Sequence, residues 1–304
     1  MSRRGRAAPH VVAVGGGHGL AATIRAVRSY AGLTTAVVAT ADDGGSTGRL
    51  RSAIDMPAPG DVRRCIEAMA GDGGRPLTDA LGHRFAGSDV EGHALGNLLL
   101  VALHAVTGDF VAAVDELSRL AGIDPATGRV LPATADPVVL RAETAGGRHV
   151  AGQVAITRTV GVDQVMVRPA DATVPPAAVE ALLDADQVVL GPGSLFTSVL
   201  AAAVVEGVRE ALKRSPGRLV YVCNVRAELA ETRGYDVADH VAALRRHGIE
   251  PDVVLAQRGA LPLGDVAAAG VAVVEADVVR PNGLAHDPAR LGPVLADLVD
   301  RPSA

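Results

Sequence analysis

The chain has 304 residues, of which 48% are hydrophobic and only 2% aromatic. A chain of this length can bury a large core, and one so poor in aromatic residues must build it from Ala, Val and Leu, which favours helices packed on a parallel sheet. The net charge of −5 and the scattered aromatic residues argue against direct nucleic-acid binding. The sequence has no apolar run long enough for a membrane span and no signal-peptide pattern, and its two distant cysteines suit a reducing compartment. We therefore expect a cytoplasmic protein.

The most informative local pattern lies in residues 11–51, which read as strand, glycine loop, helix, strand and acidic loop. A short apolar strand at 11–14 precedes the loop, a helix is expected at 20–30, and a second strand at 34–40. Glycines lack a Cβ atom and let a ligand approach the backbone, while the free N–H groups at the start of the helix attract anions. Ligands of open parallel sheets bind at the carboxyl ends of the strands. The expected nucleotide or phosphate contacts in this loop are Gly15, Gly16, Gly17, His18 and Gly19.

Two other interpretations of this loop stay open. The dinucleotide pattern G-x-G-x-x-G is met only in a relaxed form, by Gly17, Gly19 and Ala22, and Asp42 would then bind the ribose of NAD in an oxidoreductase. Alternatively, the glycines only close a tight turn between strand and helix.

An acidic pair follows the second strand and opens a polar segment at 41–60, which we expect to be a long functional loop. Asp42 and Asp43 would hold Mg²⁺ or act as catalytic groups, while Ser46 and Arg49 would contact phosphate. The alternative for the acidic pair is an Asx turn or a helix cap without a ligand.

The middle of the chain predicts two elaborations of the fold. A helical insertion is expected at about 60–121, with Asp61 capping its first helix and Asn97 buried in a later, nearly apolar one. From residue 129 the composition becomes rich in β-branched residues, and the turn at Gly146–Gly147 predicts an antiparallel hairpin within about 137–168.

A second strand, glycine loop and helix follow at 187–200, and α/β alternation continues to the end of the chain. Gly191, Gly193 and Ser194 form a second candidate anion site. Ser194 lacks the G-x-S-x-G context of a nucleophile, and the sequence supplies no base for it. Asn224 and Tyr235 follow the next strand and are expected at the same sheet edge.

Several motifs then occur in a characteristic order: GGGHGL, TADDGGSTGRLR, PGDVRRC, GHALGNLL, VLPAT, LGPGSLFTSVL, VYVCNV, ETRGYDVADHV and HGIEPDVV. Together they resemble the YvcK family of gluconeogenesis factors, which is related to the CofD 2-phospho-L-lactate transferases. The resemblance covers about residues 10–255. Two positions depart from the family pattern, since His18 stands where Thr is common and Gln153 where Glu is common.

The resemblance implies a single domain over residues 1–304, with a Rossmann-like three-layer α/β/α fold and a mainly parallel sheet. It implies binding of a UDP-sugar such as UDP-N-acetylglucosamine, with a role in cell shape, wall synthesis and the regulation of carbon metabolism. A binding protein is favoured over an enzyme. The alternative is a CofD-like phosphotransferase-type transferase that uses a nucleotide diphosphate-linked substrate with Mg²⁺. A homo-oligomer is compatible with either function.

Overall fold

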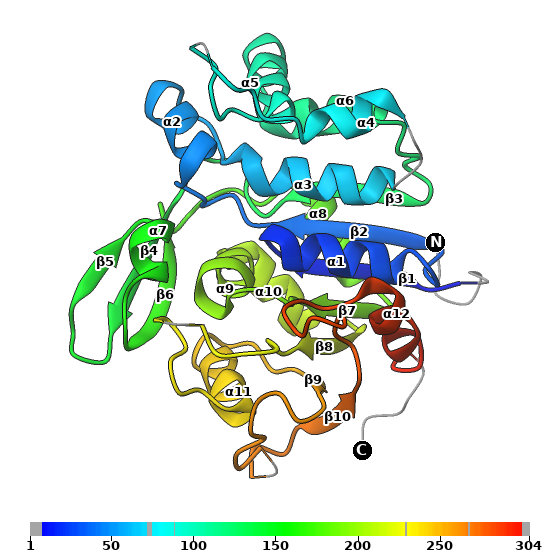
Figure 1. Ribbon diagram of the computed structural model, residues 1–304, viewed down its shortest axis with the longest axis vertical. Helices are drawn as coiled ribbons and strands as arrows, with labels where there is room; N and C mark the ends of the chain where they lie inside the picture. Colours follow the sequence, from blue (N-terminus) through cyan, green and yellow to red (C-terminus); the bar gives the residue numbers. More distant parts are fainter. Residues whose placement is uncertain (1–7, 72–74, 88, 229, 267, 300–304) are drawn as a thin grey trace.

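The computed structural model describes residues 8–71, 75–87, 89–228, 230–266 and 268–299. A parallel sheet runs through the centre of the molecule, with strands in the order β10-β9-β8-β7-β1-β2-β3 (Figure 1). Helices cover both faces, so the predicted three-layer α/β/α fold is confirmed. The strands are β1 (His10–Gly15), β2 (Leu33–Val38), β3 (Gly128–Pro132), β7 (Gln187–Leu190), β8 (Arg218–Val222), β9 (Val253–Gln257) and β10 (Ala272–Ala276).

Both faces of this sheet are buried, because alternate residues of each apolar strand point to opposite sides. In β1, Val12 and Val14 pack on one side against α8 (Pro176–Leu183), α9 (Leu200–Ala203), α10 (Glu206–Arg214) and α11 (Val237–Arg246). Val11 and Ala13 face the other side, where the covering helices are α1 (Gly17–Val27), α3 (Pro59–Ala70) and α12 (Pro288–Ala296).

The predicted helical block connects β2 to β3 and lies at one end of the molecule, beyond α3 (Figure 1). Its further helices are α2 (Gly45–Ala53), α4 (Pro76–Leu81), α5 (Leu95–Thr107) and α6 (Phe110–Leu120). The prediction of a long loop at 41–60 was wrong, because α2 occupies its middle and α3 begins at Pro59. Gly, Ser and Thr are tolerated in a first turn, and the good helix formers Arg49 to Arg51 continue the helix.

A separate three-stranded antiparallel sheet, ordered β5-β4-β6, projects to the side of the main sheet (Figure 1). It comprises β4 (Val139–Thr144), β5 (His149–Ala151) and β6 (Val162–Arg168), with α7 (Gln153–Thr157) between β5 and β6. The predicted hairpin turn is present, since the Gly147 N–H donates to the Thr144 carbonyl at 2.8 Å. Residues 128–132, whose composition suggested the start of this elaboration, instead join the main sheet parallel to β2.

Within the described ranges, no helix combines the length and apolar character that a membrane crossing requires.

Candidate functional site

The candidate site lies where the direction of strand succession in the sheet reverses. From β1 the chain adds β2 and β3 on one side, whereas from β7 it adds β8, β9 and β10 on the other. β1 and β7 are hydrogen-bonded neighbours, with Val14 beside Leu190 at their carboxyl ends. Such a reversal creates a crevice between the loops that leave the two strands. Both predicted glycine loops therefore meet at one edge of the sheet.

The two loops are packed directly on each other. A Cβ atom on Gly19 would lie only 2.0 Å from the Pro192 carbonyl oxygen, so glycine is required there by the second loop. The Thr23 hydroxyl donates to the Gly191 carbonyl at 2.6 Å, which ties α1 to the same loop. Gly17 differs, because its φ is +65° and a Cβ there would meet only the Ser198 Oγ, at 3.9 Å. The tight-turn explanation therefore accounts for Gly17, whose left-handed backbone favours glycine, whereas Gly19 is required by the contact between the two loops.

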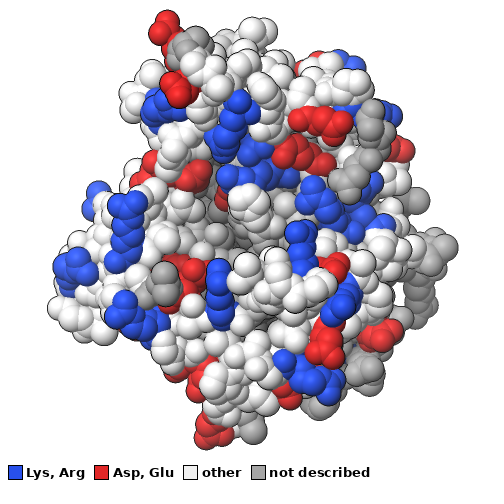
Figure 2. Space-filling view, viewed as in Figure 1, with Lys and Arg blue, Asp and Glu red and all other residues white. Residues whose placement is uncertain are grey.

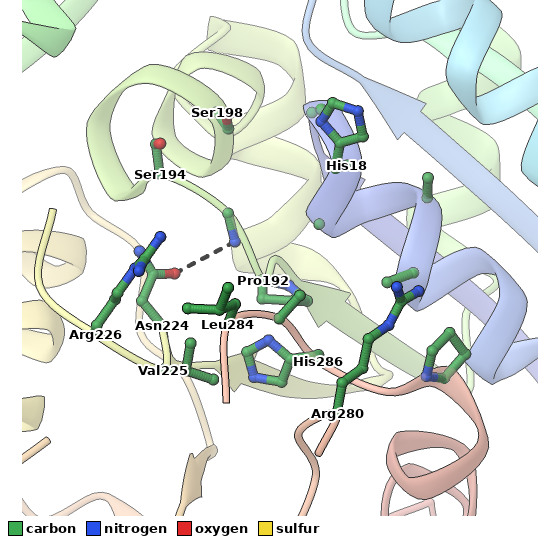
Figure 3. A pocket seen from close by; sticks show the side chains of 18 of the residues that line it. His18, Pro192, Ser194, Ser198, Asn224, Val225, Arg226, Arg280, Leu284 and His286 are labelled. Atoms are coloured by element: carbon green, nitrogen blue, oxygen red, sulfur yellow. Dashed lines mark hydrogen bonds between the residues drawn. The ribbon is translucent and has the colours of Figure 1, made fainter. Parts of the chain in front are cut away.

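A cavity of about 680 Å³ lies on one side of these loops (Figure 3). Asn224 closes its floor, with its Oδ1 accepting from the Gly193 N–H at 3.3 Å. His286 is 6% exposed, and its Nε2 has no hydrogen-bond partner among the described residues. Burial lowers the pKa of His286 to about 4, so the ring is neutral at pH 7. The lining includes Gly16, Gly17, His18, Gly19, Arg25, Gly193, Ser194, Asn224, Arg226, Glu228, Arg280 and His286.

A second cavity of about 720 Å³ lies on the other side of the loops and shares Gly17 and Ser198 with the first. The two cavities therefore adjoin at the start of α1, and we refer to them together as the cleft. Seven arginines and three carboxylates line it, although the whole chain is acidic. Figure 2 shows Lys and Arg side chains gathered around a hollow in the middle of this face. The second cavity is lined by Gly17, Asp42, Ser46, Thr47, Arg49, Asp61, Arg63, Arg64, Arg84, Asn97, Gln153 and Ser198, among others.

Asp61 does not cap α3 as predicted. The N-cap is Ala58, with Pro59 at the first helical position, and Asp61 lies in the first turn. Its Oδ2 accepts from the Gly17 N–H at 2.8 Å, and its Oδ1 accepts from Arg64 at 2.5 Å. Burial raises the pKa of Asp61, while the positive charge of Arg64 opposes that rise. A carboxylate of the protein itself thus accepts from the first amide of α1.

The acidic pair separates in space. Asp42 lines the second cavity, and its Oδ1 accepts from the Gly44 N–H at 2.9 Å in the predicted Asx turn. Asp43 points the other way, where its Oδ1 accepts from the Val154 N–H at 2.9 Å in the first turn of α7. The two carboxylates therefore lie in different surroundings, and only Asp42 lines the second cavity. No cluster of three or more His, Cys, Asp or Glu side chains suited to a metal is found among the residues with described positions.

The remaining predicted contacts fall into three groups. Ser46 and Arg49 line the second cavity. Gly15 and Gly191 stand where the two loops leave β1 and β7 and line neither cavity, and a Cβ on Gly15 would be 3.8 Å from the Gly191 backbone. Tyr235 stacks edge-on against Phe196 and His240 and does not line either cavity.

Several cleft residues escaped prediction. Arg63 and Arg64 read as an ordinary solvated helix face, yet Arg63 is 5% exposed and both line the cleft. The signal that could have identified them is two consecutive arginines within an otherwise apolar helix pattern. His286 lies in the C-terminal part of the chain, where no motif marked it. His18, by contrast, was among the expected contacts, and it lies exposed in the first cavity, where burial together with Arg64 and Arg63 lowers its pKa.

The sequence from residue 11 to residue 286 matches the profile of the CofD family, described as 2-phospho-L-lactate transferase CofD. This chain belongs to the CofD family. Among CofD relatives, a "Putative gluconeogenesis factor" of Mycobacterium tuberculosis is 42% identical over 306 residues, covering 94% of this chain and 89% of the relative. The "Gluconeogenesis factor" of Bacillus subtilis is 39% identical over 241 residues, covering 79% and 75%.

A solved structure supports the same assignment. The crystal structure of a UPF0052 family protein from Bacillus halodurans has a TM-score of 0.89 and 33% identity, and it covers 98% of this chain and 100% of that chain. The similarity to gluconeogenesis factors over most of the chain confirms the resemblance seen in the sequence motifs.

Proposed function

We propose that this protein binds a nucleotide sugar of the UDP-sugar class, such as UDP-N-acetylglucosamine. The observation that supports the proposal is the pair of adjoining cavities that share Gly17 as a lining residue. A nucleotide sugar has the matching arrangement, with a diphosphate in its middle and a bulky group at each end. The diphosphate would lie at the start of α1, and the nucleoside and the sugar would each fill one cavity.

The chemistry of the lining supports this ligand. Arginines suit phosphate oxygens because their guanidinium groups donate paired hydrogen bonds. Arg64 stands next to the first amide of α1, while Arg226 and Arg280 line the first cavity. The neutral, unpartnered ring of His286 offers a nucleobase a polar contact in a largely enclosed position. Each cavity volume lies in the range of ordinary small-molecule sites.

The biological role we propose is regulation of carbon metabolism and support of wall synthesis and cell shape. The name of the B. subtilis relative, "Gluconeogenesis factor", supports the metabolic part of this role.

The direct test is calorimetric titration of the protein with UDP-N-acetylglucosamine, with and without Mg²⁺. Binding should weaken strongly in Arg64→Gln, since a charge-assisted contact is lost, and should be unchanged in Arg119→Gln, whose side chain is exposed on α6. Titrations with UMP and with N-acetylglucosamine 1-phosphate should show weaker binding of each half. No heat with the intact ligand at millimolar concentration would refute the proposal.

A transferase acting on a nucleotide diphosphate-linked substrate is the second candidate. Asp42 supports this candidate, because its carboxylate lines the arginine-lined cavity and would hold Mg²⁺ beside a leaving phosphate. Asp42→Asn should then abolish turnover of a nucleotide-linked donor while leaving the folded state intact, and Asp43→Asn should affect turnover far less. A wild-type protein that turns over no donor from a broad panel of nucleotide diphosphate-linked compounds would exclude this function.

A further inference from the structure

Three polar side chains from separate parts of the chain, Ser46, His93 and Asn97, meet beside the second cavity, which Ser46 and Asn97 line. Ser46, in the first turn of α2, is 6% exposed, and its Oγ lies 3.0 Å from the Nδ1 of His93. Asn97, on α5, donates from its Nδ2 to the same Oγ at 3.2 Å. In the His93 tautomer that carries its proton on Nε2, Nδ1 is an acceptor, and the Oγ donates its own proton to it while accepting from the amide. A hydroxyl that donates to an imidazole nitrogen is the arrangement of an activated nucleophile.

Neighbouring contacts hold this arrangement in place. Arg63 donates from its Nε to the Asn97 Oδ1 at 3.1 Å, which fixes the amide so that its NH₂ group points to Ser46. Arg63 is in turn paired with Glu67 one helical turn further along α3. The His93 backbone is held by hydrogen bonds of its N–H to Val90 and of its carbonyl oxygen to Phe85. The pair is therefore oriented before any ligand binds, as catalytic groups must be.

The electrostatics favour a phosphorus centre as the target. Arg49, Arg63, Arg64 and Arg84 line the same cavity and would attract the oxygens of a phosphoryl group. The first amides of α2 have no intrahelical acceptor and can stabilise charge on an oxygen next to Ser46. Burial, with Arg49 and Arg84, lowers the pKa of His93, which favours the neutral form of the ring that a general base requires.

We propose that Ser46 is a nucleophile for phosphoryl groups and that His93 is its general base. The Ser46 Oγ attacks phosphorus of a phosphate ester or anhydride, forming an Oγ–P bond. The P–O bond to the leaving group breaks, and the leaving oxygen keeps the electron pair. The hydroxyl proton passes to His93 Nδ1, which returns it to the leaving oxygen. This activity goes beyond the binding of a nucleotide sugar and does not depend on it.

The test uses the full chain and a fluorophosphonate probe, which replaces the unknown substrate. Attack by the Ser46 Oγ on the probe releases fluoride and leaves a stable phosphonyl-serine that peptide mass spectrometry locates. We expect one label per chain on Ser46, none on that peptide in Ser46→Ala, and unchanged labelling in Ser52→Ala, a matched control on the exposed side of α2. The label should not lie on Ser194 or Ser198, which line the same cleft.

The role of His93 is tested with His93→Asn. The amide oxygen of Asn takes the place of Nδ1 and keeps the hydrogen bond to Ser46, but it cannot take up a proton. We expect labelling to slow by about 100-fold, as for loss of a general base. If this variant fails to fold, the pH profile of wild-type labelling replaces it, with a half-maximal rate below pH 6.5. Absence of label on Ser46, or labelling independent of both His93→Asn and pH, would overturn the proposal.

Discussion

The buried carboxyl group of Glu231 provides a quantitative test of the forces around the second glycine loop. Glu231 is 1% exposed, its Oε1 accepts from the Thr197 hydroxyl at 3.3 Å, and its Oε2 has no hydrogen-bond partner among the described residues. Burial, followed by repulsion from Glu228, raises the pKa of Glu231 from 4.5 to about 7. The folded state therefore holds a proton that the unfolded state releases between these two values.

The sign follows from proton linkage. Because the folded state binds more protons between pH 4.5 and about 7, the free energy of unfolding falls as the pH rises through that window. At 1.36 kcal/mol for each unit of pKa, the loss above pH 7 is about 3 kcal/mol. Glu231→Gln keeps the shape of the side chain without its ionisation. The variant should gain about 2 to 3 kcal/mol relative to wild type when the pH is raised from near 5 to near 8.

Urea unfolding of both proteins at these two pH values measures the difference. Glu180→Gln, an exposed substitution on α8, is the matched control and should leave the pH dependence of wild type unchanged. If Glu231→Gln and wild type lose stability in parallel as the pH rises, the carboxyl group does not titrate as its burial requires, and the argument fails.

Three further changes test other parts of the structure. Burial lowers the pKa of His286 to about 4, so the unfolded state binds a proton before the folded state does as the pH falls. The free energy of unfolding should therefore fall by about 3 kcal/mol from pH 6.5 to 4. Calorimetric melting of His286→Asn should show a smaller loss over the same pH range. Gly19→Ala should cost about 2 kcal/mol or more because its Cβ would clash with the backbone of Pro192, whereas Gly146→Ala should be nearly neutral in the same urea assay. Asp236→Ala should cost about 1 kcal/mol in thermal unfolding, since it removes the capping box of α11, and an unchanged melting temperature would contradict that role.

Local signals explain which parts of the fold could be predicted from the sequence. The predicted strand at 187–190 coincides with β7, because four apolar or strand-compatible residues stand directly before a Gly-Pro-Gly turn. The edge of the sheet that holds the candidate site could also be predicted, because both glycine loops directly follow such strands. In contrast, α2 was missed because the glycines and hydroxyl residues at 45–48 carry loop propensity, although they form only its first turn.

Contacts between residues that are far apart in the sequence could not be predicted from local patterns. Asp61 was assigned a local capping role, and nothing local indicates that its carboxylate binds the amide of Gly17, 44 residues earlier. Asp42 and Asp43 are neighbours in sequence, yet consecutive residues in an extended segment point in opposite directions. Their separation into two surroundings depends on α7, which the sequence had suggested only as part of a hairpin. The pairing of Ser46 with His93 likewise joins residues 47 positions apart.

The interlocked glycine loops have a consequence for how the molecule folds. β1 is an interior strand, and its neighbour β7 begins only at Gln187 of the 304 residues. Until β7 adds, β1 keeps an unpaired edge, and the contact between Thr23 and Gly191, separated by 168 residues, cannot form. Contacts of such long sequence separation form slowly. We therefore expect recovery of ligand binding during refolding to lag behind recovery of helical circular dichroism, with ligand stabilising only chains in which the two halves of the sheet have joined.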